Sequence, residues 1–586
     1  MIGSTLKSIK PAFWLANAQE ACERLAYFGI RAVLPLMMVA VGGGGLGLNM
    51  AEKGIIYGIW ALIQCLVPMV SGGFSESFGY KKSLIVAFCI NTLGYLLMAN
   101  ILNIVSLITG SADLNTTLNF WLMMIGGVTI GLGTALFKPP VQGIVAKSLN
   151  EKNSGFGFGL FYWVVNVGGL LAPMAASALR GTSDNPTWHY VFYGAAFVTL
   201  FNLVITLILF KEPERTAEEI EKHKNETLLR VFINTLKTLW NDKNMLIFLL
   251  IVSGFWLMFM QLWDLLPNFI DEWVDRRAVG GVLAGAGGVF DFMLDNGALK
   301  PEMIINIDAA AIILFVLPLS ALFARYKMMT ALILGMVISV VGFVLSGLTM
   351  SGAVCCLAVF IFAIGEIICS PKFSEYIGMT APADKKAIYM GFANIPFAVG
   401  WAFGNFLSGP LYQIFSSKEV IARDYLVNNG ANVADLENLP IDELMSLVQA
   451  KAGVADTYAA TEVLWNDSNP WVIWIVLGVI GAASMVGMIA FYYKSGMNKI
   501  DDDRSAGNIA ELEKSETKDA ENKDAENKDA DAKDAENKDA ENKDADADKS
   551  DDAKSSAVPG DDYTEAEKEL MKPITKADVE DITIKD

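Results

Sequence analysis

Four charged residues interrupt an apolar segment near the start of the chain, residues 11–41: Glu20, Glu23, Arg24 and Arg31. The segment is long enough to cross a bilayer, for which about 20 apolar residues suffice. Charges at that depth are costly, so they usually face a bundle interior or a wet cavity and mark an ion or substrate path. On a helix Glu20, Glu23 and Arg24 share one face, so Arg24 can hold one carboxylate ionised while the other exchanges a proton. The alternative is a buried ion pair that only fixes this helix to a neighbour.

The same helix face continues with Tyr27, one turn further along. The complete pattern is Glu20-x-x-Glu23-Arg24-x-x-Tyr27-Phe28-Gly29, followed by Arg31-Ala32. This pattern resembles the ExxER signature of the proton-dependent oligopeptide transporters, a branch of the major facilitator superfamily (MFS). The resemblance implies a carrier that imports di- and tripeptides together with protons. It also implies that the two acids and Arg24 serve proton coupling, while Tyr27 and Arg31 face the substrate.

The composition is that of a polytopic membrane protein. The chain has 586 residues, of which 53% are hydrophobic, and its mean hydropathy is +0.39. Such values, with long apolar runs throughout, indicate many membrane-spanning helices. Residues 501–586 contain 30 acids and 14 bases and so carry −16 of the formal net charge of −19. The acidity therefore belongs to a tail and says little about the substrate.

Cysteine and histidine usage argues against a disulfide framework, a metal site and enzymatic chemistry. All six cysteines lie in apolar segments without metal-ligand spacing, and the chain has only two histidines, His189 and His223. Cysteine in such surroundings behaves as a small hydrophobic residue. No intramembrane pairing of His with an acid, Ser or Cys is apparent. We therefore expect no enzyme activity and no cofactor or metal, with protons as the coupling ion and no nucleic-acid partner.

The apolar runs predict an all-α fold of twelve transmembrane helices in two six-helix MFS-type halves. Only helices are plausible, because backbone polar groups must be satisfied within each membrane segment. Lysine and arginine in the short loops place both termini in the cytoplasm, in a plasma (inner) membrane. The expected spans are roughly 11–41, 53–78, 83–109, 118–146, 156–180, 187–210, 245–274, 302–324, 328–349, 353–380, 387–415 and 471–494.

The remaining segments divide the chain further. Residues 211–244 are polar, with apolar positions that fit an amphipathic helix at the cytoplasmic face. From about residue 500 a five-residue repeat without apolar content predicts disorder; a single solvated helix or a tail that binds an unidentified protein is the alternative. The expected domains are an N-terminal half (1–210), the linker (211–244), a C-terminal half (245–499) with outward loops 275–301 and 416–470, and the acidic tail (500–586).

A glycine-rich loop between the second and third spans contains Glu76, Lys81 and Lys82. Its spacing resembles the cytoplasmic loop motif of the MFS, with Glu in place of the usual Asp. The resemblance implies that Glu76 and Lys81 help to latch the cytoplasmic side. An ordinary positively charged inside loop is the alternative.

Lys138 lies within the fourth span, in a stretch that runs from Gly131-Leu-Gly133 to Lys138-Pro139. The family has a similar stretch whose lysine faces the ExxER cluster and the substrate. A lysine at that depth needs a partner, which Glu20 or Glu23 would provide. The alternative is that Lys138 extends to a lipid headgroup.

In the fifth span, Tyr162 and Asn166 belong to a block that looks like the family's FYxxxNxG pattern. The amide of Asn166 has donors and acceptors that suit a peptide backbone, and Tyr162 lies one turn back on the same face. Asparagine is also a common hydrogen-bonding residue between membrane helices, so a purely structural role is the alternative.

The C-terminal half contributes three further candidates. Asn306 matches a substrate-contacting asparagine of the family, and Asp308 follows it without an assigned counterpart. Glu366 lies in a stretch resembling the family's GE…SP block, so it is expected to bind the ammonium end of a peptide. The pocket tryptophan of the family falls between Phe397 and Trp401, and its place stays open.

A departure from the family predicts a specific contact. Bacterial relatives carry an acid that can pair with the first-helix arginine, but Met260 stands at that position here. Asp264 lies one helical turn later on the same face. We therefore predict that Asp264 pairs with Arg31 and closes the outer side; the alternative is that Asp264 sits in a wet vestibule.

These features predict a proton-coupled symporter that imports di- and tripeptides by alternating access. Lys138 and Arg31 would meet the peptide carboxylate. Two rival functions remain open: transport of another small anion or an amino-acid-like solute, and a membrane sensor that transports nothing.

Overall fold

The computed structural model describes most of the chain up to residue 495. The described residues are 9–68, 71, 75, 78–149, 154–212, 228–323, 326–382, 385–436 and 439–495. They belong to one compact unit, Met1–Ile509. The predictions for Glu76 and for the tail 500–586 concern residues outside the described part of the chain.

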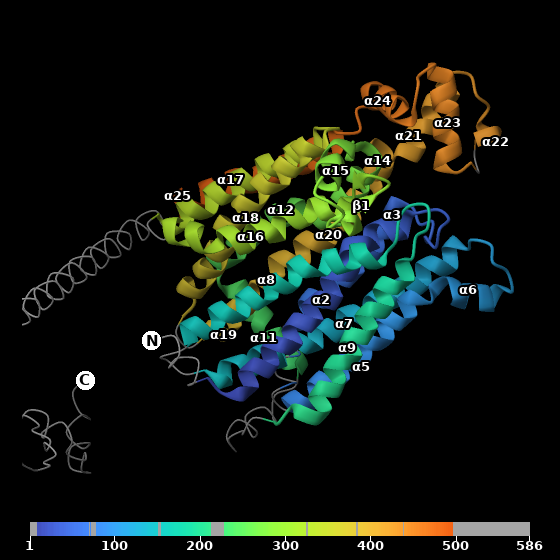
Figure 1. The fold of residues 1–586 in the computed structure, drawn as a ribbon. Helices are drawn as coiled ribbons and strands as arrows, with labels where there is room; N and C mark the ends of the chain where they lie inside the picture. The colour runs from blue at the N-terminus through green and yellow to red at the C-terminus, as the bar shows by residue number, and fades with distance from the viewer. Residues whose placement is uncertain are drawn as a thin grey trace, which may run out of the picture. The chain divides into compact units, whose positions relative to one another are not determined.

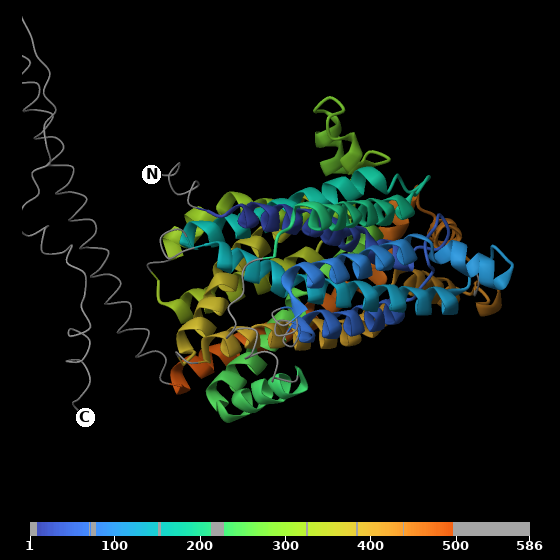
Figure 2. The same cartoon turned by 90° about the horizontal axis from the view of Figure 1, so that it is seen from below.

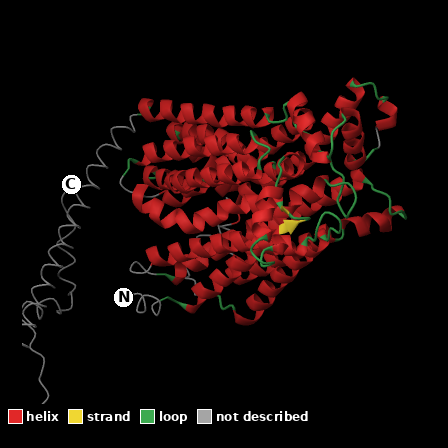
Figure 3. Ribbon diagram, turned by 45° about the horizontal axis from the view of Figure 1, so that its top comes forward, coloured by secondary structure: helices red, strands yellow, loops and turns green. Residues whose placement is uncertain are grey.

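Almost every described residue of the first part of the chain is helical (Figures 1 and 3). The helices of this part are α2 (Pro11–Val39), α3 (Met50–Leu66), α5 (Tyr80–Ala99), α6 (Ile101–Thr109), α7 (Thr116–Ser148), α8 (Ser154–Leu179) and α9 (Trp188–Leu209).

The second part begins with an amphipathic helix and then returns to long apolar helices. Its helices are α11 (Leu228–Asn241), α12 (Lys243–Phe259), α13 (Gln261–Asp264), α14 (Leu266–Trp273), α15 (Arg277–Ala284), α16 (Pro301–Phe323), α17 (Met328–Gly347), α18 (Gly352–Thr380), α19 (Lys386–Phe392), α20 (Asn394–Phe415), α21 (Lys418–Asn428), α22 (Val433–Leu436), α23 (Ile441–Ala452), α24 (Thr457–Ser468) and α25 (Val472–Lys494).

Nine helices among the described residues are long and apolar enough to cross a membrane. This confirms an all-α polytopic membrane protein, whereas the count of twelve spans stays a prediction. The helices α2, α3 and α20 account for the difference. Charged residues interrupt α2, only 17 residues of α3 belong to the helix as described, and α20 contains Asn, Ser and Gln side chains.

The buried apolar side chains form separate clusters along the chain. One large cluster comes from Met50 and residues 239–492, and two others come from within residues 9–210. Figure 1 shows the matching arrangement, with the blue-to-teal helices α2, α5, α7 and α9 on one side and the yellow-to-orange helices α16, α17 and α25 on the other. Each group of helices thus has its own core.

The helices α3 and α20 form the closest junction between the two groups. A Cβ added at Gly54 would lie 2.4 Å from the Asn405 carbonyl oxygen, and one added at Gly409 would lie 2.5 Å from the Met50 carbonyl oxygen. Side chains larger than hydrogen are excluded at both positions, because the two backbones touch. The glycines therefore let the two groups pack tightly at this end of the bundle.

Both predicted outward loops contain regular structure. The segment 275–301 holds α15, a 3₁₀ turn at Asp291–Met293 and an antiparallel hairpin of β1 (Leu294–Asp295) and β2 (Ala298–Leu299). This green segment projects from the helices in Figure 2. The segment 416–470 contains the short helices α21 to α24. We call the end of the bundle that carries these segments the predicted outer end.

Local sequence explains the start of α3, which lies earlier than predicted. The Asn49 side chain accepts a hydrogen bond from the Glu52 N–H at 2.9 Å, and the Glu52 carboxylate accepts one from the Asn49 N–H at 3.0 Å. This reciprocal capping box fixes the helix start at Met50. Lys53, which the sequence placed at the boundary of the span, is therefore inside the helix.

Candidate functional site

A cavity of about 440 Å³ lies between the two groups of helices. Its lining comes from α2, α3, α7 and α8 on one side and from α12, α14, α16, α18 and α20 on the other. Its polar and charged lining residues are Arg24, Tyr27, Arg31, Gln64, Lys138, Asn166, Glu302, Asp308, Glu366, Ser370 and Asn394. A polar cavity between apolar helices is the usual place for a transported solute or ion.

The first-helix acids and Arg24 form one buried cluster. Arg24 Nε lies 3.2 Å from Glu20 Oε1, and a second ion pair joins Arg24 Nη2 to Glu23 Oε2. All three side chains are almost completely buried. From α7, the Thr134 hydroxyl lies 3.5 Å from Glu23 Oε1. Two carboxylates thus share one guanidinium, which leaves room for one of them to take up a proton.

Lys138 lines the cavity beside this cluster, but the direct pairing predicted for it is wrong in this structure. Among the described residues, both acids form their ion pairs with Arg24. Lys138 interacts with Arg24, Glu23 and Glu20 only through longer-range electrostatics. Arg24 lies on the same helix as both acids, within about one turn of each, and therefore forms both ion pairs. Lys138 therefore presents its charge to the cavity.

Tyr27 connects the first helix to α3. Its hydroxyl and the Gln64 side chain are hydrogen-bonded at 2.8–3.0 Å, and Trp60 Nε1 donates to Gln64 Oε1 at 2.8 Å. The Arg24 guanidinium carbon lies 5.3 Å from the centre of the Tyr27 ring. Tyr27 is thus held in place at the cavity wall.

Asp264 lies at the centre of a buried polar cluster that joins the two groups of helices. Its carboxylate forms an ion pair with Arg31 and accepts hydrogen bonds from Trp401 Nε1 at 2.5 Å and from Asn405 Nδ2 at 2.7 Å. The Arg31 guanidinium carbon also lies 4.5 Å from the Trp401 ring centre. The predicted contact between Arg31 and Asp264 is confirmed, and Asp264 is not in a wet vestibule.

Lys53 belongs to the same cluster, and sequence reasoning missed it. Its Nζ donates to the Asp264 carbonyl oxygen at 2.8 Å and to Asn268 Oδ1 at 2.6 Å, while Asn268 Nδ2 donates to the Pro35 carbonyl oxygen at 2.9 Å. The helix breaks between Asp264 and Leu266, so this stretch can supply a carbonyl to a lysine. The capping box before Lys53 was the available signal that it lies inside a helix.

Two predicted substrate contacts do not reach the cavity. Asn306 Nδ2 donates to the Leu170 carbonyl oxygen of α8 at 3.0 Å and is not part of the lining, and neither is Tyr162. Asn166 does line the cavity, although its Nδ2 donates to the Tyr162 carbonyl oxygen at 2.8 Å. In α16 the rotation of the helix turns Asp308, rather than Asn306, toward the cavity.

The opposite cavity wall carries two neighbouring acids, Asp308 of α16 and Glu366 of α18. Both line the cavity, and the two carboxyl groups lie close enough to interact electrostatically. Glu366 lines the cavity, where the sequence placed it, whereas Asp308 had been left without a role. Phe397 and Trp401 both line the cavity as well, so the wall that the sequence left open is shared by the two rings.

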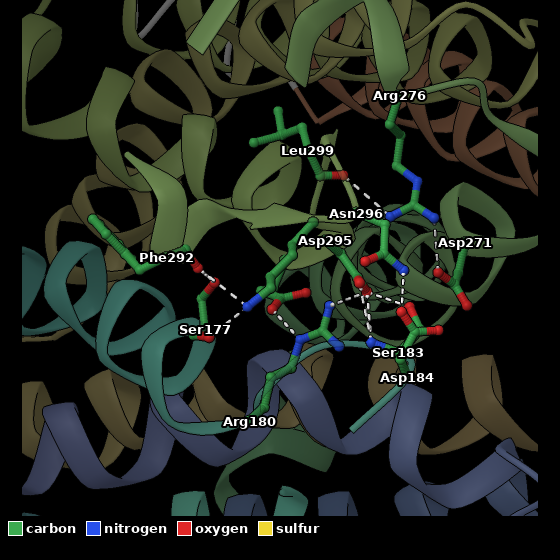
Figure 4. A network of polar contacts seen from close by, with 12 residues as sticks. Ser177, Arg180, Ser183, Asp184, Asp271, Arg276, Phe292, Asp295, Asn296 and Leu299 are labelled. Atoms are coloured by element: carbon green, nitrogen blue, oxygen red, sulfur yellow. Dashed lines mark hydrogen bonds and ion pairs between the residues drawn. The ribbon is translucent and has the colours of Figure 1, made fainter. Parts of the chain in front are cut away.

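A second polar contact between the two groups of helices involves the segment 275–301 (Figure 4). Arg180 Nε lies 2.5 Å from Glu302 Oε1, and Lys300 Nζ donates to the Ser177 carbonyl oxygen at 2.7 Å. The Ser183 hydroxyl donates to Asp295 Oδ2 at 2.5 Å. We call these five residues (Arg180, Ser183, Asp295, Lys300 and Glu302) the outer clasp. Burial, together with the neighbouring Arg180, lowers the pKa of Lys300 below its usual range.

Lys81, predicted to act in gating with Glu76, contacts the end of α9. Its Nζ donates to the carbonyl oxygens of Phe210 at 2.8 Å and Leu207 at 3.1 Å, and its backbone N–H donates to Glu212 Oε2 at 2.7 Å. These contacts join elements within the N-terminal group of helices. A gating role for Lys81 stays a prediction.

The two groups of apolar helices enclose a charged central cavity, an arrangement typical of multi-pass membrane transporters. The model of the Major Facilitator Superfamily matches residues 20–405, and the chain belongs to that superfamily.

One curated relative is named a peptide transporter and another a multidrug resistance protein. The Peptide transporter YePEPT of Yersinia enterocolitica is 30% identical over 197 residues, which cover 33% of this chain and 34% of that protein. The chain thus matches about a third of the length of this relative. The Multidrug resistance protein MdtH of Escherichia coli O1:K1 / APEC is 22% identical over 399 residues, 67% of this chain and 85% of that protein.

Solved structures share the fold. A POT family transporter in complex with a thioalcohol conjugated peptide aligns with a TM-score of 0.57 and 16% identity, covering 84% of this chain and 99% of that chain. The nucleoside transporter NupG aligns with a TM-score of 0.58 and 11% identity, covering 82% of this chain and 100% of that chain. These similarities support the MFS fold, to which peptide transporters and transporters of other solutes both belong.

Proposed function

We propose that this protein is a proton-coupled symporter that imports di- and tripeptides, with both termini in the cytoplasm. The observation that carries the proposal is the separation of charge across the cavity. Lys138 and Arg31 lie on the wall of the N-terminal helices, and Asp308 and Glu366 lie on the opposite wall. A zwitterionic peptide matches this arrangement, with its carboxylate toward the cations and its ammonium group toward the acids.

The buried cluster of Glu20, Glu23 and Arg24 supports coupling to protons. An acid that gains a proton releases its hold on Arg24, which changes the interactions of the N-terminal helices around the cavity. Proton binding can therefore shift the balance between states in which the cavity opens to opposite sides of the membrane. The similarity to a curated peptide transporter agrees with this proposal.

Uptake of labelled dialanine into proteoliposomes, with and without an imposed inward proton gradient, tests the proposal. We expect accumulation above the outside concentration only with the gradient. Competition separates the rival functions: an excess of unlabelled dipeptide should abolish uptake, whereas single amino acids and small anions should not. Accumulation that is independent of the proton gradient, or failure of dipeptides to compete, would contradict the proposal.

A further inference from the structure

The two first-helix acids do not belong to the lining of the cavity. Arg24 and Tyr27 are among the residues that line it, whereas Glu20 and Glu23 are not. The Glu23 side chain is almost completely enclosed, with a 1% exposed fraction. A proton that Glu23 takes up or releases therefore needs a polar partner on another side of the acid.

Two buried polar side chains of α5 lack partners. Asn91 and Tyr95 lie about one turn apart on the same side of the helix, and both are 0% exposed. The nitrogen and the oxygen of the Asn91 amide and the Tyr95 hydroxyl have no hydrogen-bond partner in the described part of the chain. Such groups are rarely left unpaired inside a protein, and their partner is commonly an ordered water molecule.

The helix α7 brings these side chains close to Glu23. α5 and α7 pack side by side, and a Cβ added at Gly133 of α7 would overlap the Asn91 amide oxygen (Figure 1). The next residue, Thr134, is fully buried, and its hydroxyl lies 3.5 Å from Glu23 Oε1. Tyr95 packs in the same buried cluster as the middle of α2. The unpartnered amide thus lies against the α7 residue next to the one that contacts Glu23.

We propose that Asn91, Tyr95 and Thr134 hold water against Glu23 and that Glu23 exchanges its proton with this water, an inference that rests on the proposed coupling to protons. On release, the O–H bond of the protonated Glu23 carboxyl breaks, the proton passes to the held water, and the carboxylate pairs with Arg24. Uptake of a proton reverses these steps. Asn91 and Tyr95 act through the water and are therefore positioning residues. The proton and the substrate thus approach the first helix from different sides.

Several titratable groups interact with Glu23 and have to be separated from it in a pH-dependent measurement. They are Glu20 and Arg24 of α2, Lys138 of α7 and Tyr95 of α5. Arginine stays protonated in proteins, and a phenol is neutral near pH 7. Because Thr134 contacts Glu23, the water site favours Glu23 over Glu20 as the acid that exchanges.

Infrared difference spectroscopy of the full-length protein in lipid nanodiscs, without substrate, tests the site. Spectra recorded as the pH changes contain the band of the protonated Glu23 carboxyl, which is identified by its absence in Glu23→Gln. In water labelled with heavy oxygen, the O–H band of a held water molecule shifts. We expect both signals in the parent protein. Asn91→Leu should lose the water signal and protonate Glu23 at a roughly tenfold lower proton concentration, because an apolar neighbour disfavours the carboxylate.

Tyr95→Phe removes a single oxygen atom and keeps the site testable if Asn91→Leu does not fold. It should weaken the water signal and change the titration in the same direction. The matched controls Asn103→Leu and Tyr193→Phe, at exposed positions of α6 and α9, should behave as the parent protein.

Two outcomes would overturn the water site and leave peptide transport standing. One is a water signal and a carboxyl titration that are unchanged in both folded variants, and the other is a Glu23 band that does not titrate in the parent protein. Failure of the parent protein to accumulate dialanine under a proton gradient would instead overturn the proposed function, whereas the infrared signals are measured without any substrate.

Discussion

At the scale of single residues, three groups of buried charges, besides the outer clasp, involve residues with proposed roles in transport. Arg24 holds Glu20 and Glu23 within one helix, Asp264 joins Arg31 to the C-terminal helices, and Asp308 lines the cavity together with Glu366. The first location has two carboxylates for one guanidinium, the second is a matched ion pair, and the third has two acids. Because an unbalanced charge is expensive in a membrane, each location is sensitive to protonation or to a ligand.

The first-helix acids are expected to couple transport to protons. Replacing Glu23 by Gln, or Glu20 by Gln, should abolish proton-driven accumulation of dialanine while preserving part of the counterflow exchange. Exchange needs binding and movement of the two halves, but no net release of a proton. Parallel uptake and counterflow measurements in proteoliposomes check this, and normal accumulation by both variants would show that coupling occurs elsewhere.

Asp264 is expected to hold the predicted outer end closed. Asp264→Asn should reduce uptake by more than tenfold, because removing one partner of a buried ion pair costs about 3–5 kcal/mol. The double change Met260→Glu with Asp264→Asn should restore much of the uptake by returning an acid to the neighbouring turn. Initial rates of dialanine uptake, normalised to the amount of folded protein, measure both effects; normal uptake by the single variant would disprove the gating role.

At the scale of elements, the segment 275–301 connects the two groups of helices rather than simply linking two spans. Its hairpin places Asp295 against the turn after α8, and Lys300 and Glu302 follow at the start of α16. The helices α3 and α20 pack backbone to backbone at the same end. Opening of the predicted outer end must therefore separate both the outer clasp and the α3–α20 junction.

Cross-linking of the outer clasp tests this movement. Cysteines introduced together at Ser183 and Asp295 should form a disulfide under mild oxidation and stop dialanine uptake, because the two side chains are in contact in the closed arrangement. A reductant should restore uptake, and each single cysteine variant should be insensitive to oxidation. Undiminished uptake by the fully cross-linked protein would show that the clasp does not open during transport.

At the scale of the whole molecule, the sequence predicts that transport depends on the chain up to about residue 499. The repeat within the tail, residues 518–549, has no apolar side chain larger than that of alanine to pack against the helices. Truncation after Lys499 should therefore leave the rate of dialanine uptake per folded molecule unchanged within about twofold, well below a 1.4 kcal/mol effect. A well-expressed truncated protein without uptake would assign the tail an active role in transport.

The sequence could predict which charges are buried better than it could predict which way they face. Arg31 and Asp264 were paired correctly because helical spacing limits an acid one turn from a vacated position to the same face. Asn306 was misplaced because a match in sequence does not determine the rotation of α16 about its axis. Lys53 escaped notice because hydropathy alone cannot separate a lysine at a membrane boundary from one just inside a capped helix.

The contacts at the predicted outer end join cations of the N-terminal helices to acids of the C-terminal part of the chain. Arg31, Lys53 and Arg180 belong to the N-terminal helices, while their partners Asp264, Asp295 and Glu302 belong to the C-terminal part of the chain. When these contacts separate, we expect the N-terminal wall to carry net positive charge and the opposite wall, where Lys300 offsets one of the three acids, to carry net negative charge. If the substrate is a zwitterionic peptide as proposed, we expect this field to turn its carboxylate toward α2 and α3 before it reaches the cavity. The same charged residues that close the outer end are thus expected, after it opens, to orient a charged solute that enters.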